Sequence, residues 1–200
     1  MSSFIGHGLV GFITGFTSKE PEKSSSWRKY WIIWLIIVAM APDLDYFISF
    51  LNSSNHNGIR ITHSIFGVLI LPILTIVVLL IINKSRKWLK SLSFQVLIAG
   101  VSHIILDILV GVYNNPYFWP FSSKVYRLPF GILPSAGTLD ISNYYLYRNL
   151  LIEMGVLLPI LICIYLIRST KLKRNYKIIF TICLSLISIG FMYWAFGLSR

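Results

Sequence analysis

The chain has 200 residues, of which 56% are hydrophobic and 12% are charged, with a mean hydropathy of +0.71. A soluble domain carries roughly twice that charged fraction, so the composition argues against a soluble domain and favours a membrane protein. The net charge of +11 lies in short basic clusters between apolar runs. No recognition module accompanies these clusters, so we expect no nucleic-acid partner.

The predicted elements begin with a short, glycine-rich apolar segment over residues 4–16, which is compatible with a tilted helix packed closely in lipid. Five longer apolar segments follow, each close to the ~20 residues that a helix needs to cross a bilayer. They cover roughly residues 31–50, 61–82, 94–112, 149–167 and 178–197. The sequence therefore predicts an all-α fold, a polytopic membrane helix bundle with five to six transmembrane helices in a single integral membrane domain over residues 1–200.

Basic residues mark every second connection between these segments. Loops 17–30, 83–93 and 168–177 are rich in lysine and arginine, whereas loops 51–60 and 113–148 carry few. The rich clusters include Lys19, Lys23, Lys84 and Lys171. By the positive-inside rule the rich loops are cytoplasmic and the other two face outward from the cell membrane. The 113–148 loop is rich in aromatic residues and proline, which is typical of an interfacial belt and also compatible with a lid over a site.

Ionisable side chains inside membrane segments are costly and therefore indicate function. Asp43 and Asp45 lie two residues apart beside Pro42, and their carboxylates repel each other unless a cation or a proton intervenes. His103 and Asp107 are four residues apart and share one face of a predicted helix. The complete set of candidate metal ligands is His7, Asp43, Asp45, His63, His103, Asp107 and Glu153.

The predicted topology gives these candidates a common depth. Counting about 1.5 Å per residue from the cytoplasmic end of each helix places all seven in the outer half of the membrane. The loop charges alone set this count, so the agreement predicts one shared site toward the outer face.

Imidazole and carboxylate ligands together suit a divalent metal, with zinc as the first expectation and manganese or iron as alternatives. Seven ligands are enough for two or more ions, and paired ions favour phosphoester cleavage. Asp45 or Asp107 is the candidate general base. A serine triad of Ser64 or Ser102 with His103 is disfavoured, because the chain has no Gly-x-Ser-x-Gly elbow.

Two further functions use the same residues. A divalent-cation or proton transporter is disfavoured because the inner halves of the segments are almost purely apolar, whereas a pathway needs polar groups on both sides of the midplane. A non-catalytic protein with a structural metal is the other alternative. Structural sites are usually closed and four-coordinate, and seven candidate ligands exceed that number.

Several short motifs, in order along the first 120 or so residues, resemble the YdjM-type inner-membrane proteins, a family predicted to be membrane-bound metal-dependent hydrolases. The motifs are Gly6-His7, Pro42-Asp43-Leu44-Asp45, Thr62-His63-Ser64, Ser102-His103-Ile104-Ile105-Leu106-Asp107 and Trp119-Pro120-Phe121. The resemblance implies a metal role for the six motif histidines and aspartates, and not for Glu153. It also makes Arg60 and Ser64 the candidates for substrate binding, although Gly58-Ile59-Arg60 replaces the family's usual His-Arg-Gly.

The ligand set is also similar in style to the zinc-dependent phospholipase C and P1 nuclease group. That similarity implies a phosphoester substrate, and a lipid substrate suits the membrane location. The sequence thus predicts a membrane-embedded metal-dependent hydrolase whose partners are membrane lipid and a small-molecule or lipid substrate.

Overall fold

The computed structural model describes residues 3–18, 25–51, 53–56, 58–82, 85–111, 114–135, 142–168 and 173–198. Within these ranges the chain is helical, and the only strand-like pairing is an isolated β-bridge between Asn115 and Tyr126. The predicted all-α class is confirmed. Of the basic residues named for the topology, Lys19, Lys23, Lys84 and Lys171 lie outside the described residues, as do parts of the predicted outer loop, at 113 and 136–141.

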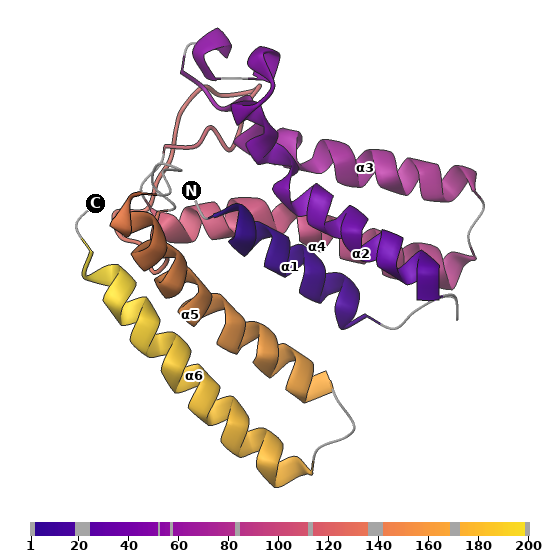
Figure 1. The fold of residues 1–200 in the computed structure, drawn as a ribbon. Coiled ribbons are helices and arrows are strands. Elements are labelled where there is room, and N and C mark those ends of the chain that lie inside the picture. Colours follow the sequence, from indigo (N-terminus) through magenta and orange to yellow (C-terminus); the bar gives the residue numbers. More distant parts are fainter. Residues whose placement is uncertain are drawn as a thin grey trace. The chain divides into compact units, whose positions relative to one another are not determined.

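The described residues form six α-helices joined in part by short 3-10 turns (Figure 1). The helices are α1 (Phe4–Phe16), α2 (Ser25–Met40), α3 (Ile65–Ile81), α4 (Arg86–Val110), α5 (Tyr144–Arg168) and α6 (Arg174–Phe196). The turns are η1 (Ala41–Tyr46), η2 (Ser49–Leu51), η3 (Ser53–His56) and η4 (Ile61–His63). All four turns lie in the connection between α2 and α3.

Three of the helices are long and apolar enough to cross a membrane: Trp88–Val110, Tyr144–Ile167 and Arg174–Phe196. Helices α1 and α3 are apolar but shorter. The predicted segment 31–50 is not one helix, because α2 ends at Met40 and the chain tightens into η1. Pro42 accounts for this change, since proline has no backbone N–H and disfavours the α conformation in the residue before it.

The chain divides into two compact units, which are described separately. The C-terminal unit comprises Met1–Gly6, Leu106–Tyr113 and Leu128–Arg200, and its main feature is the packed pair α5 and α6 (Figure 1). Gly155 makes room for the Phe191 ring, because a Cβ at Gly155 would lie 2.4 Å from that ring. The Ser188 hydroxyl donates a hydrogen bond to the Val156 carbonyl at 3.0 Å.

The N-terminal unit comprises His7–Ile105 and Asn114–Arg127. Its core forms where Leu35, Val38 and Ala39 of α2 pack with Val96 and Ala99 of α4. Two tryptophans of α2 also satisfy polar groups of neighbouring helices. Trp31 Nε1 donates to Gln95 Oε1 at 2.8 Å and Trp34 Nε1 donates to Thr75 Oγ1 at 3.0 Å. Such pairing is needed where no water is available.

Helix α1 lies directly against α2 because glycine lines the contact. A Cβ at Gly11 would come within 2.6 Å of the Leu35 carbonyl oxygen and 2.8 Å of the Ile36 Cα. Small residues allow such close approach of helix backbones in lipid. His7 is one turn before Gly11, so this contact fixes the position of His7 relative to α2.

Candidate metal centre

The two aspartates of η1 point in different directions. Successive residues of a 3-10 helix point about 120° apart around the helix axis. Asp43 and Asp45 are two residues apart, so their side chains lie on different faces of the turn. Both side chains are buried. Asp43 faces the histidines, whereas Asp45 faces Arg60. Arg60 also lies within 3.5 Å of Asp43 Oδ1, so its positive charge relieves part of the repulsion expected between the two carboxylates.

Three histidines from three elements surround Asp43. We call His7 of α1, Asp43 of η1, His63 of η4 and His103 of α4 the histidine–aspartate cluster, and all four residues have 0% relative exposure. Asp43 Oδ1 lies 3.2 Å from His63 Nε2 and 3.6 Å from His103 Nε2, and the two Nε2 atoms lie 3.2 Å apart. The His7 ring stacks on the His103 ring at 3.8 Å, and its Nε2 lies 3.8 Å from Asp43 Oδ2.

A backbone carbonyl fixes the tautomer of His103. Its Nδ1 lies 2.8 Å from the Ala39 carbonyl oxygen, which can only accept a hydrogen bond. Nδ1 therefore carries the hydrogen. In the neutral ring Nε2 then presents its lone pair to the cluster.

A hydroxyl fixes the tautomer of His63 in the same sense. Thr62 Oγ1 donates to Asp45 Oδ2 at 3.0 Å and lies 3.0 Å from His63 Nδ1. A hydroxyl has one hydrogen, and the Asp45 carboxylate receives it. His63 Nδ1 must therefore donate to Thr62. In the neutral ring the Nε2 lone pair of His63 then faces that of His103.

The converging donor atoms fit a divalent ion. Asp43, His63 and His103 are buried, and their potential ligand atoms lie within 4.8 Å of one another. Zinc ligands lie about 2.0–2.2 Å from the ion, so tetrahedral neighbours are roughly 3.4 Å apart. The separations of 3.2, 3.2 and 3.6 Å match that value. Partners on the other ring nitrogens are also a regular feature of histidine ligands.

Arg60 forms a two-pronged ion pair with Asp45. Its Nε donates to Asp45 Oδ2 at 2.9 Å and its NH2 group donates to Oδ1 at 2.6 Å. The guanidinium also lies over the Tyr46 ring, 4.7 Å from its centroid, and its NH2 group is 3.5 Å from Asp43 Oδ1. Burial lowers the pKa of Arg60, but the hydrogen bond and charge of Asp45, with Tyr46 and Asp43, outweigh burial and raise it.

Ser64 forms the N-cap of α3. Its side chain accepts a hydrogen bond from the Gly67 backbone N–H at 3.0 Å and donates to the Ile61 carbonyl at 2.7 Å. A Cβ at Gly67 would lie 2.5 Å from the Thr62 carbonyl oxygen, so glycine lets η4 fold back onto α3. The cap and the glycine together hold the turn that carries His63.

Within the N-terminal unit the structure brings together four of the seven candidate ligands, those of the histidine–aspartate cluster. Asp45 adjoins them through Thr62. Asp107 is buried one turn after His103 on α4, and it belongs to the C-terminal unit with Glu153. Glu153 is also buried, and its Oε1 accepts from the Ser3 backbone N–H at 2.9 Å. The ligand roles of all seven residues stay predictions.

Sequence reasoning missed two groups that orient the cluster. Thr62 was visible only as a neighbour of His63 in the Thr-His-Ser motif. The contact of the Ala39 carbonyl with His103 could not be predicted from the sequence, because this carbonyl is free to accept a hydrogen bond only where α2 ends.

These features define a helical membrane protein with a buried imidazole–carboxylate cluster. The chain belongs to the YdjM inner membrane protein family, whose model matches residues 1–196. The match confirms the resemblance drawn from the motifs. No curated protein and no solved structure matches the chain.

Proposed function

We propose that this protein is a membrane-embedded, metal-dependent hydrolase that cleaves a phosphoester or a phospholipid near the outer leaflet. The observation that carries the proposal is the triangle of Asp43 Oδ1, His63 Nε2 and His103 Nε2, with sides of 3.2, 3.2 and 3.6 Å. Two imidazole nitrogens and a carboxylate converge there in fully buried positions, and a bound cation offsets the repulsion between their lone pairs. Zinc is the first choice for this ligand set, with manganese or iron as alternatives.

Asp43, His63 and His103 hold the first ion in this proposal. A bound divalent ion supplies Lewis-acid activation of water and of a phosphoryl oxygen. His7, which belongs to the same unit, extends this ligand set, because its Nε2 lies 3.8 Å from Asp43 Oδ2.

The remaining polar residues take supporting roles. Asp107 is the proposed general base, because it follows His103 by one helical turn. Asp45 positions His63 through Thr62, since Arg60 and Thr62 engage both of its oxygens. Arg60 is the proposed anchor for a substrate phosphate.

The proposed orientation has six membrane crossings, and the cluster faces outward. Helices α4, α5 and α6 have the length to cross. The other three crossings in this proposal are α1, α3, and the segment formed by α2 together with η1. Support comes from the basic residues Arg28, Arg86 and Arg174 at connections that share one predicted side.

The first test is metal analysis of the purified protein, wild type against Asp43→Ala and His103→Ala. We expect bound zinc in the wild type and a loss of at least one ion per chain in each variant. A chelator is then expected to lower the unfolding temperature of the wild type only, because a ligand that binds the native state stabilises it. Wild-type protein without metal, or unchanged stoichiometry in both variants, would overturn the ligand assignment.

Activity is measured on the metal-loaded protein with a soluble chromogenic phosphodiester and a phospholipid. Hydrolysis that depends on His103 supports the proposal. Bound metal with no hydrolysis of either substrate refutes the hydrolase and favours the structural-metal alternative.

A cation or proton transporter is the second candidate. The 3.2 Å approach of the His63 and His103 Nε2 atoms favours it, because a shared proton satisfies such a pair as well as a metal does. Proteoliposomes loaded with a pH-sensitive or zinc-sensitive dye distinguish the candidates. A proton or zinc flux in the wild type that is lost in His103→Ala identifies a transporter. If the wild type hydrolyses a phosphoester but shows no flux, the transporter is rejected.

A further inference from the structure

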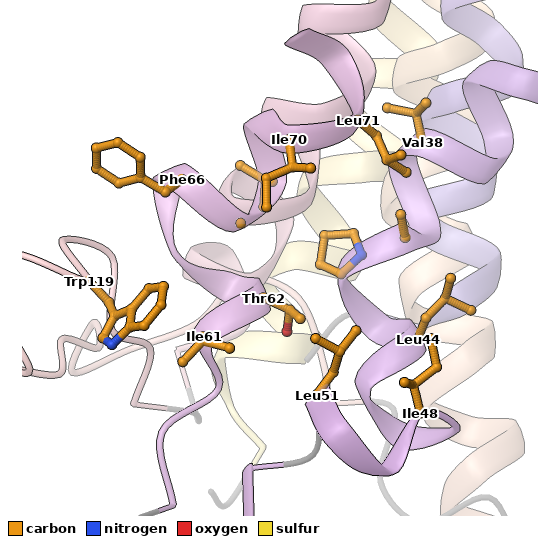
Figure 2. A pocket seen from close by; sticks show the side chains of 14 residues that line it. Val38, Leu44, Ile48, Leu51, Ile61, Thr62, Phe66, Ile70, Leu71 and Trp119 are labelled. Carbon is orange, nitrogen blue, oxygen red and sulfur yellow. The ribbon is translucent and has the colours of Figure 1, made fainter. Parts of the chain in front are cut away.

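An apolar cavity of about 260 Å³ lies beside η1 and η4, the two turns that carry Asp43 and His63 (Figure 2). Its walls come from α2, η1, the residues after η1, η4, the start of α3 and Trp119. Among its lining residues, Thr62 and Trp119 are those with polar side-chain atoms. The cavity therefore suits a hydrocarbon ligand and not a polar one.

The cavity and the cluster share one wall. Pro42 and Leu44 line the cavity, and Asp43 between them faces the histidines. In η4, Ile61 and Thr62 line the cavity, and the next residue is His63. Thr62 joins the two sides directly, because its hydroxyl is bonded to Asp45 and lies 3.0 Å from His63 Nδ1. An apolar group bound in the cavity would thus contact residues that are direct sequence neighbours of Asp43 and His63.

The cavity opens through half-exposed apolar side chains. Ile48, Phe66 and Ile70 line it and are 44%, 48% and 57% exposed. The segment that carries Trp119 is tied to the start of α3 by a hydrogen bond from Ile65 N–H to the Tyr117 carbonyl at 3.0 Å. An opening lined by apolar side chains admits a ligand from the lipid, because apolar surface can face the hydrocarbon region of a bilayer without a hydration penalty.

The volume of the cavity favours a hydrocarbon chain over a helix of a second copy of the protein. A helix with its side chains is about 10–12 Å across, so a cavity of about 260 Å³ does not hold a turn of a second copy. A single extended hydrocarbon chain is narrower and enters end-on or along its length.

We propose that this cavity binds one acyl chain of a lipid substrate and thereby directs the phosphoester of that lipid toward the histidine–aspartate cluster. The inference rests on the proposed hydrolase function and deepens it, since it makes the substrate a lipid and not a soluble phosphoester. In this proposal the acyl chain enters the cavity past Ile48, Phe66 and Ile70, and Thr62 lies at the polar end of the cavity.

The first experiment measures binding without turnover. The protein, in nanodiscs of phosphatidylcholine, receives a phosphatidic acid probe with a diazirine on one acyl chain, and mass spectrometry maps the cross-links after illumination. We expect cross-links concentrated on η1, η4 and the start of α3. Ile70→Trp is expected to reduce them about tenfold by filling the cavity, with Ile48→Trp as a second filling variant.

The matched control is Ile73→Trp, on the same helix as Ile70. Ile73 is 52% exposed and is not a lining residue, so the same change there is expected to leave the cross-links unaltered. Cross-links spread evenly over the lipid-facing helices overturn the inference. A cross-link from a second copy of the chain at the cavity, found with a protein-borne diazirine, also overturns it.

The second experiment separates this inference from the proposed function. Hydrolysis is compared for phosphodiesters with methyl, octyl and dodecyl chains in wild type, Ile70→Trp and Ile73→Trp. A preference of about tenfold for the longer chains, lost only in Ile70→Trp, supports the inference. Hydrolysis with equal chain preference in all three proteins overturns the cavity assignment but not the hydrolase. Cross-linking at the cavity without any hydrolysis overturns the hydrolase and leaves a lipid-binding site.

Discussion

At the residue scale, the cluster depends on groups that do not face it. Thr62 contributes no atom to the triangle of donor atoms, yet its hydroxyl determines which nitrogen of His63 carries the hydrogen. Ala39 does the same for His103 through a backbone oxygen. Outer partners of this kind orient the ring and raise the basicity of a metal-binding histidine.

We expect Thr62→Val to weaken zinc binding by roughly 10–100-fold, the usual effect of losing an outer hydrogen-bond partner. Valine keeps the shape but removes the acceptor for His63 Nδ1. The measurement is competition with a chromophoric chelator. Thr62→Ser, which retains the hydroxyl, is the control and is expected to bind nearly as well as wild type. Equal affinities for all three proteins would show that the hydroxyl does not orient His63.

We expect Arg60→Gln to lower the free energy of unfolding by roughly 3 kcal/mol, because it leaves the buried Asp45 carboxylate without its cation. Arg60→Lys is expected to restore only part of this, since an ammonium cannot form the two-pronged pair. Thermal unfolding in detergent measures both. A Gln variant as stable as the wild type would contradict the importance of this pair.

The Arg60 ion pair also has a predictable pH dependence. The pKa of Arg60 is raised above its ordinary value in the folded protein. The stability linked to its charge is therefore fully present below that ordinary pKa and is lost only as the pH rises through the folded pKa. The stability difference between wild type and Arg60→Gln should therefore be constant from roughly pH 7 to pH 9. A difference that shrinks over this interval would indicate that Arg60 loses its charge there.

At the element scale, the position of His7 depends on how closely α1 approaches α2. The Leu35 carbonyl oxygen would lie 2.6 Å from a Cβ at Gly11, and backbone atoms cannot give way as a flexible side chain can. One methyl group at this point must therefore move the helix that carries His7.

We expect Gly11→Ala to destabilise the protein by about 1–3 kcal/mol, as overpacking commonly does. The control is Gly190→Ala on α6, where a Cβ meets nothing within 4 Å and alanine favours the helix. Unfolding temperatures and bound zinc are measured for both. If the two variants behave alike, α1 is not held at the distance that the structure gives.

At the scale of the whole molecule, orientation in the membrane decides which solution the cluster faces. In a background with Cys163 and Cys183 changed to serine, Ser54→Cys is expected to react with a membrane-impermeant maleimide from outside intact cells. Ser85→Cys is the control and is expected to react only after the membrane is opened. The reverse pattern would invert the topology and place the cluster toward the cytoplasm.

The sequence predicted much of the helical organisation, because apolar length and loop charge are local properties. It predicted one apolar segment over residues 31–50, whereas the structure divides this segment into α2 and the turns that begin with η1. It also did not reveal that Asp43 and Asp45 face different partners. That difference depends on the 3-10 turn and on Arg60, which is 15 residues away from Asp45.

For the candidate site, the histidines and aspartates were visible as polar residues in apolar segments, whereas their tautomers were not. Tautomers depend on distant partners, such as Ala39 for His103, 64 residues apart in the chain. The apolar cavity was equally out of reach, since its lining comes from turns and helices that meet only in the folded chain.

The order of the cluster residues has a consequence for biosynthesis. They occur at positions 7, 43, 63 and 103, so His103 is the last to leave the ribosome. Chains are made from the N-terminus at roughly 5–20 residues per second, and N-terminal parts fold first. The full set of imidazoles and Asp43 is therefore synthesised before α5 and α6 exist. Assembly of the cluster can therefore begin before α5 and α6 have left the ribosome.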